Sequence, residues 1–411
     1  MSTGTLPSPK ISTPSAIQRP RWYRFYAMFS EEFAEQAIER ANLAPGSTIL
    51  DSWLGAGTTA SAAVVAGHNV IGVDINPVMV TIARGRLIDQ ESAWLEIDRV
   101  AKAVKRMGRL QIAQHDPLHL WFGLEAATTL RRWERAIRHE AAIATMSDLD
   151  CFTMTALFEA AVKMGAAYRS KNPTWLKSPD PSQRIEMSSA ELSRLITQIA
   201  KAKVPLCIQA LNNAKAALQV GTATCLGIPS SSVDLVLTSP PYCTRIDYAV
   251  GTRLELAVLG LDASATRELR DRTMGTSTIR QYATEPNDSW GRECVKFLAA
   301  VRHHKSKSSE TYYLKTYLQY FSDLFSSLAE IDRCLRVNGQ AVIVVQDSHY
   351  KGIRTDLARI VREMGEHNGW RLLNSYDFES NRNMRRVNNR SRSYGENLKA
   401  IETVLSFSKV R

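Results

Sequence analysis

Apolar residues in the first quarter of the chain change from one periodicity to another. After Ser30 they recur at helical spacing until Pro45, which predicts one amphipathic helix. Apolar runs at 48–51 and 69–74 are strand-length, and a glycine-rich stretch and a helical segment from about 58 to 66 lie between them. Strand, glycine loop, helix and strand in this order predict a βαβ unit, and therefore a parallel sheet.

Helical periodicity dominates from about 77 to 215, and strand character returns at 217–220 and 233–238. The C-terminal part adds a helix at 313–335, the strand QAVIVVQ, a helix from near Thr355, and two final strands in WRLLNSY and ETVLSFS. We therefore expect one α/β catalytic domain with two insertions. The predicted segments are a disordered Ser/Thr/Pro-rich arm (1–20), a cofactor-binding part (21–90), a helical insertion (91–215), a catalytic part (216–261), a polar insertion (262–310) and the C-terminal half of the sheet (311–411).

Composition narrows the class of protein. The chain has 411 residues, 44% of them hydrophobic, so it can bury a large core. Its net charge of +11 favours an acidic partner, with nucleic acid the first candidate. The six cysteines are widely spaced without a C-x-x-C pair, which indicates reduced thiols and no metal site. We find no apolar run of transmembrane length and expect a cytoplasmic protein.

The stretch LDSWLGAGTTA, residues 50–60, lies where the first strand turns into a helix. Glycines there let the backbone approach a ligand, and the helix N-terminus offers free N–H groups. A P-loop is excluded because no Lys precedes the Ser/Thr. Two ligands stay open on this motif alone. A dinucleotide fits Gly55-x-Gly57-x-x-Ala60 with Asp74 downstream, and S-adenosylmethionine fits Asp51 facing a cationic amino-acid group with Asp74 accepting from ribose hydroxyls.

A second motif, TSPPY at 238–242, ends the strand that begins at Val233. Two prolines stop the strand, since each lacks an N–H and fixes φ. Ser239 and the Pro240 carbonyl can accept hydrogen bonds from an exocyclic amine, which favours a nucleophilic nitrogen. Tyr242 can stack on a base that has been flipped out of a helix. The carboxyl end of such a strand is also where an open α/β sheet binds its ligands.

Together, TSPPY and LDSWLGAGTT resemble the amino-methylating DNA methyltransferases, which make N4-methylcytosine or N6-methyladenine. The resemblance implies a Rossmann-like class I methyltransferase fold, α/β, with a mostly parallel seven-stranded sheet, helices on both faces and a helical insertion. It implies S-adenosylmethionine as cofactor and no metal. Ser52-Trp53 replaces the usual Pro-Phe pair. The implied cofactor-binding residues are Phe29, Asp51, Gly55, Gly57, Thr58, Asp74 and Thr222, and the implied catalytic residues are Ser239, Pro240, Pro241 and Tyr242.

Ser at the first position of the corner is typical of the N4-cytosine enzymes in this family, whereas Asp is typical of adenine enzymes. We therefore expect a site-specific cytosine-N4 methyltransferase acting on double-stranded DNA, with a restriction or phage-defence system as possible partner. N6-adenine methylation, RNA N2-guanine methylation and a non-catalytic nucleic-acid-binding relative remain alternatives.

One further stretch suggests contact with DNA. Residues 381–393 carry five arginines and no acidic residue between the two last strands. Arginine and asparagine suit phosphates and base edges. We expect a DNA-contacting loop rather than a merely solvated one, with Arg382, Arg385, Arg386, Arg390 and Arg392 as its arginines.

Overall fold

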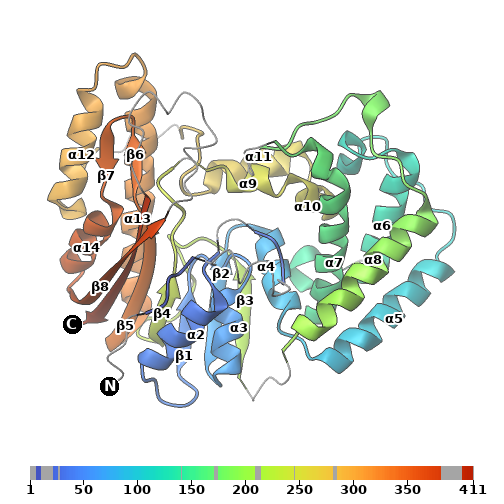
Figure 1. Ribbon diagram of the computed structural model, residues 1–411, viewed down its shortest axis with the longest axis horizontal. Coiled ribbons are helices and arrows are strands. Elements are labelled where there is room, and N and C mark those ends of the chain that lie inside the picture. Colours follow the sequence, from blue (N-terminus) through green and yellow to red (C-terminus); the bar gives the residue numbers. More distant parts are fainter. Residues whose placement is uncertain are drawn as a thin grey trace.

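The computed structural model describes residues 6–10, 22–25, 28–139, 141–170, 175–208, 214–244, 246–280, 285–380 and 400–410. A seven-stranded sheet with the order β3-β2-β1-β4-β5-β9-β8 lies at its centre (Figure 1). The five neighbouring strands β3, β2, β1, β4 and β5 pair in parallel, and β9 is antiparallel to both of its neighbours. The strands are β1 (Thr48–Asp51), β2 (Asn69–Asp74), β3 (Ala216–Val220), β4 (Val233–Thr238), β5 (Leu335–Gln346), β8 (Trp370–Ser380) and β9 (Ala400–Lys409).

The predicted class I methyltransferase fold is confirmed by this mostly parallel, seven-stranded arrangement. A short antiparallel pair that the sequence did not predict, β6 (Ser348–Tyr350) with β7 (Ile353–Thr355), follows β5. The βαβ unit also forms as predicted. Ser30 is the N-cap of the helix that precedes this unit, and its hydroxyl accepts a hydrogen bond from the Phe33 amide at 3.2 Å.

Both faces of the central strands β1 and β4 are buried, as expected for parallel strands, whereas the edge strand β3 is mostly exposed. Successive residues of a strand point to opposite faces, so Ile49 and Leu235 pack on one face while Leu50 and Val236 pack on the other. The first face is covered by α2 (Glu31–Arg40) and α3 (Thr58–Val65). The second is covered by α12 (Arg292–Arg302), α13 (Leu314–Cys334) and α14 (Leu357–His367).

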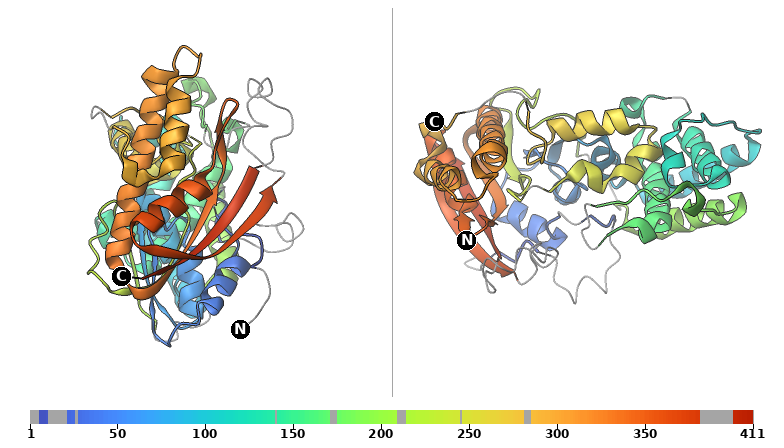
Figure 2. Two further views of the ribbon diagram at one scale, coloured as in Figure 1. Left: turned by 90° about the vertical axis from the view of Figure 1, so that its left-hand side faces the viewer. Right: turned by 90° about the horizontal axis from the view of Figure 1, so that it is seen from above.

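A separate helical unit extends from one end of the sheet (Figure 2). Its core surrounds α7, whose Phe152, Leu157 and Phe158 are fully buried. Gly85 lets α4 approach α7 closely, because a Cβ there would meet the Cys151 carbonyl carbon at 2.7 Å. The unit contains α4 (Pro77–Gly85), α5 (Gln90–Arg106), α6 (Leu124–Arg138), α7 (Asp148–Met164), α8 (Ser189–Lys203) and α10 (Arg253–Val258), and α9 (Tyr248–Gly251) precedes α10.

Two segments pack more closely than the sequence analysis expected. The polar segment 262–310 contains α11 (Ala263–Arg272), which buries no residue, but its second helix, α12, buries Phe297 and Val301 against the sheet. In the N-terminal arm, Leu6 is buried and the Pro9 carbonyl accepts from the Ser30 amide at 2.7 Å. Burial of Leu6 therefore contributes to the stability of the core.

Candidate functional site

A cavity of about 500 Å³ opens at the carboxyl ends of β1, β2 and β4. This is the edge where open α/β sheets bind ligands, and the volume is typical of small-molecule sites. The structure brings both sequence motifs to this one cavity. The predicted residues that line it are Phe29, Asp51, Gly55, Thr58, Asp74, Thr222, Ser239, Pro240, Pro241 and Tyr242.

The glycine loop is held by its own backbone and by Asp74. Gly57 has φ +80° and caps α3, and a Cβ at this position would lie 2.7 Å from the Ala83 Cβ. Only glycine meets both requirements without strain. The Gly55 amide donates to Asp74 Oδ2 at 2.9 Å, and the Asn76 amide donates to Oδ1 at the same distance. Asp74 therefore fixes the loop while each of its oxygens keeps a free lone pair.

Two carboxylates, the buried Asp51 and the partly buried Asp74, give the cavity its electrostatic character. Burial raises the pKa of each to about 6, although hydrogen bonds to both side chains oppose the shift. For Asp51 these come from the Thr238 hydroxyl at 2.7 Å and the Trp53 amide at 3.2 Å. No described Lys or Arg pairs with either carboxylate. A cationic ligand would supply the missing positive charge and favour their ionised forms.

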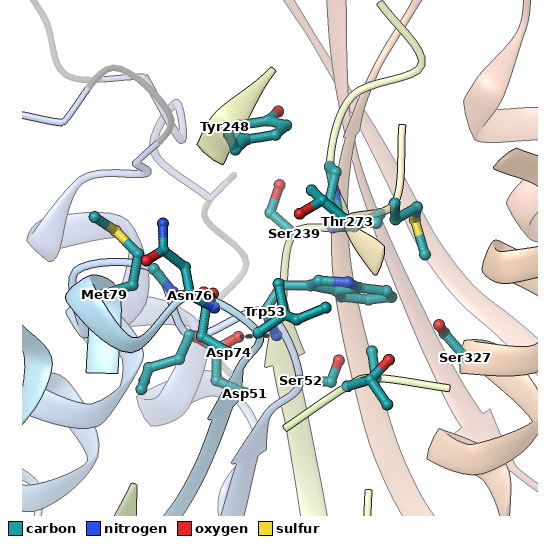
Figure 3. Close-up of a pocket in the computed structure, with 18 of the residues that line it drawn as sticks. Asp51, Ser52, Trp53, Asp74, Asn76, Met79, Ser239, Tyr248, Thr273 and Ser327 are labelled. Atoms are coloured by element: carbon teal, nitrogen blue, oxygen red, sulfur yellow. Dashed lines mark hydrogen bonds between the residues drawn. The ribbon is translucent and has the colours of Figure 1, made fainter. Parts of the chain in front are cut away.

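Ser52 and Trp53 occupy the positions where the family that the sequence resembles usually has Pro-Phe. The Ser52 hydroxyl is buried and has no hydrogen-bond partner among the described residues. Figure 3 shows the Trp53 indole extending from the glycine loop toward the side of the cavity where Thr273 and Ser327 lie. An unpartnered buried hydroxyl is costly, so a ligand that reached it would gain a hydrogen bond.

Three hydrogen bonds fix the Pro-Pro corner. The Ser239 hydroxyl donates to the Val344 carbonyl at 2.9 Å, and Tyr320 donates to the Pro241 carbonyl at 2.8 Å. The Tyr242 amide donates to the Tyr248 hydroxyl at 3.2 Å. Because the only hydrogen of the Ser239 hydroxyl is used within the protein, this oxygen can only accept from a ligand.

The side chain of Tyr242 is also fixed, through a residue that sequence reasoning missed. Its hydroxyl donates to Glu402 Oε1 on β9 at 2.9 Å. Burial raises the pKa of Tyr242 well above its usual value, with the Glu402 charge acting in the same direction, so the phenol keeps its proton. Glu402 also lines the cavity. Its signal in the sequence was the single acid in the predicted strand ETVLSFS.

The cofactor side of the cavity contains the remaining predicted residues. Thr222 lines it and its hydroxyl lies 2.9 Å from that of Thr224. Phe29 lines it from the segment before α2, with its ring edge-on to Phe33. Asn76, which no sequence motif indicated, also lines the cavity, and its Oδ1 accepts from the Val78 amide at 3.0 Å at the start of α4.

The predicted DNA-contacting arginines lie outside the described residues, so their role stays a prediction. The described part of the chain contains no group of three His, Cys, Asp or Glu side chains able to hold a metal ion. It also contains no helix long and apolar enough to cross a membrane. All six cysteines lie in described segments, and none of them forms a disulfide there.

Comparison with known proteins points to one family. Residues 7–85, which include the glycine loop and Asp74, match the model of the N6/N4 DNA methylases. The Type II methyltransferase M.BsoBI of Geobacillus stearothermophilus is 28% identical over 61% of this chain and 54% of its own length. The chain is a relative of the amino-methylating DNA methylases. The Type II methyltransferase M.AvaI of Nostoc sp. is a further relative, 23% identical over 86% of this chain and 79% of its own.

This DNA methylase relative spans about half the length of M.BsoBI. The match to the family model ends before Ser239, so the role of the Pro-Pro corner depends on the geometry described above. Among solved structures, the TehB-like SAM-dependent methyltransferase from Corynebacterium glutamicum shares 11% identity at a TM-score of 0.28 and covers 92% of this chain and 87% of its own. The fold is established by the strand order β3-β2-β1-β4-β5-β9-β8.

The cavity fits S-adenosylmethionine, the cofactor of this family. Asp51 and Asp74 lack a cationic partner among the described residues, the glycine loop has no room for a side chain at Gly57, and the Ser52 hydroxyl is unpartnered there. A sulfonium compound with an amino-acid group and a ribose matches this set of acceptors.

Proposed function

We propose that this protein is an S-adenosylmethionine-dependent DNA methyltransferase that methylates the exocyclic N4 of cytosine in a specific double-stranded sequence. The observation that carries the proposal is the Ser239–Val344 hydrogen bond at 2.9 Å, in the same cavity as Asp51 and Asp74. It makes Ser239 a pure acceptor, and an exocyclic amine has two hydrogens to donate.

S-adenosylmethionine, when bound, supplies an electrophilic methyl group. Asp51 would face its ammonium group and Asp74 its ribose hydroxyls. Ser239 Oγ and the Pro240 carbonyl would accept from the two amine hydrogens, which concentrates the lone pair on nitrogen. Tyr242 and Tyr248 both line the cavity, and their rings would contact the flipped base.

The net charge of +11 and the match to the DNA methylase family support DNA as the partner. We further propose that the protein works in the cytoplasm as the modification part of a restriction–modification or phage-defence system, because both relatives are Type II methyltransferases.

The decisive experiment incubates the protein with unmethylated PCR-amplified DNA and isotope-labelled S-adenosylmethionine. Mass spectrometry of the digested nucleosides then identifies the product, and Asp74→Ala serves as a control for cofactor dependence. We expect N4-methylcytosine. N6-methyladenine would replace the cytosine assignment with the adenine one, and labelled N2-methylguanine from a parallel RNA sample would overturn the DNA substrate. If neither nucleic acid yields a labelled nucleoside, the protein is a non-catalytic relative of the family.

A further inference from the structure

Glu402 is a buried acid whose two oxygens are used unequally. The residue lies on β9 opposite Gln346, is 3% exposed, and lines the cavity together with Ser239. Its Oε1 accepts from the Tyr242 hydroxyl at 2.9 Å. Its Oε2 is buried without a hydrogen-bond partner in the described part of the chain. A buried carboxylate oxygen left unpaired is unfavourable, which points to a ligand as its partner.

The sheet register places Glu402 on the same cavity wall as the amine acceptors. Ser239 bonds to the Val344 carbonyl, and Glu402 pairs with Gln346, two residues further along β5. Residues two apart on a strand share one face and lie roughly 7 Å apart. Val344 and Glu402 both line the cavity. A base with its amine at Ser239 therefore lies within side-chain reach of Glu402.

The charged and titratable surroundings of Glu402 come from three elements. Burial raises the pKa of Glu402, while Lys10 and the Tyr242 hydrogen bond oppose that shift. Lys10 belongs to the N-terminal segment, and its Nζ donates to Gln346 Oε1 at 3.2 Å. Tyr248, from α9, contacts the corner through the Tyr242 amide. Glu402 is therefore a more basic carboxylate than an exposed one, with a nearby cation that favours its charge.

We propose that Glu402 is the proton acceptor for the target amine. This inference rests on the proposed function. Transfer forms a bond between the methyl carbon and the amine nitrogen and breaks the carbon–sulfur bond, which leaves a neutral thioether and a positively charged nitrogen. That nitrogen loses one proton to Glu402 Oε2, and the protonated carboxyl releases it to solvent after the product leaves.

Single-turnover methylation of unmethylated PCR-amplified DNA, at saturating labelled cofactor and between pH 5 and 8.5, tests this role. Glu402→Gln keeps an oxygen that can accept from Tyr242 but removes the proton acceptor. We expect its rate at pH 8 to fall roughly a hundredfold, as for loss of a general base. The ratio of wild-type to variant rate should approach one as the pH falls, because wild-type Glu402 then becomes protonated. Cofactor affinity, measured by calorimetry, should be unchanged.

Two variants that retain Glu402 keep the proposal testable if Glu402→Gln does not fold. Tyr242→Phe and Lys10→Met each remove an interaction that lowers the pKa of Glu402. Both should therefore move the acid limb of the rate profile to higher pH. If the acid limb of the rate profile lies at the wild-type pH in both variants, the proposal is overturned. A Glu402→Gln protein with the wild-type rate would also overturn it.

A Tyr242→Phe protein with the same rate loss and profile as Glu402→Gln would also overturn it, since Glu402 would then act only by positioning Tyr242. If wild-type protein methylates no DNA, the proposed function fails. If wild-type protein is active and the variants behave otherwise than expected, only the role of Glu402 fails.

Discussion

The Ser239 hydroxyl and the Val344 carbonyl, joined by a hydrogen bond of 2.9 Å, connect the Pro-Pro corner to the neighbouring strand β5. This bond sets the direction in which the serine oxygen can act, because its hydrogen is already used. The corner is therefore an acceptor site built by pairing β4 with β5, and its chemistry depends on the sheet register as much as on the motif.

Replacing Ser239 by Ala should slow methyl transfer without weakening cofactor binding. Loss of one buried hydrogen-bond acceptor costs about 1–3 kcal/mol, which corresponds to roughly 5- to 150-fold in rate. Ser327→Ala is a matched control, because it removes a hydroxyl that lines the same cavity but donates within α13 to the Asp323 carbonyl. Single-turnover rates and calorimetry measure the two effects. A wild-type rate for Ser239→Ala would contradict the amine-acceptor role.

Asp74→Ala should weaken S-adenosylmethionine binding by at least about 1–3 kcal/mol through lost ribose contacts. The same change releases the Gly55 and Asn76 amides, so the loop should also loosen. Asp377→Ala serves as a control, since that acid bonds to Thr403 and is not among the residues lining the cavity. Equal affinities of the two variants in calorimetry would exclude Asp74 from the cofactor site.

Without ligand, the Asp51 and Asp74 carboxylates should make stability depend on pH. Burial raises the pKa of Asp51 and Asp74 from 3.8 to about 6. A carboxyl whose folded-state pKa is raised stabilises the fold below its unfolded pKa and loses that contribution as pH rises through about 6. Asp51→Asn removes one such group. The melting temperature of the variant minus that of wild type should therefore be larger at pH 7.5 than at pH 4.5. Thermal unfolding at both values checks this, and a constant difference would count against the buried charge.

Gly57→Ala should destabilise the protein more than Gly67→Ala. Both glycines have positive φ, +80° and +78°, so alanine costs about 1–2 kcal/mol at either site. Only at Gly57 would the new methyl group also meet Ala83, at 2.7 Å, whereas nothing lies within 4 Å at Gly67. Overpacking adds roughly 1–3 kcal/mol. Equal melting temperatures for the two variants would mean that the loop and α4 can separate at no cost.

The arginine-rich segment gives a prediction that depends on sequence alone. Changing Arg385, Arg386 and Arg390 to Ala should flatten the slope of log affinity against log salt by roughly 2–3 units if all three neutralise phosphates. Filter binding at several salt concentrations measures the slope. An unchanged slope would assign DNA contact to another basic surface.

The sequence predicted those elements whose signals are local. The βαβ unit could be recognised because the strand period, the glycine turn and the helix period follow one another within 48–74. Helix α12 was missed although Cys294, Phe297, Leu298 and Val301 have helical spacing, because its polar neighbours dominated the composition. The arm was expected to be disordered, but one apolar residue, Leu6, reaches the core.

The residues of the candidate site likewise divide into those with a local signal in the sequence and those without one. Asp51, Asp74 and Ser239 belong to short motifs and could be singled out from sequence. Glu402 could not, because its contact with Tyr242 joins residues 160 apart and exists only when β9 pairs beside β5. Long-range pairing of this kind leaves no local pattern except a single acid in the predicted strand.

Strand β9 is the last strand in sequence order but lies inside the sheet, between β5 and β8. During synthesis on the ribosome, β5 must therefore wait until residues 400–409 have emerged before it gains its second partner. Until then its apolar edge, which includes Val342 and Val344, stays open to pairing with other chains. Activity would begin only once translation has passed β9, and chaperones that cover open strand edges should influence the yield of folded protein.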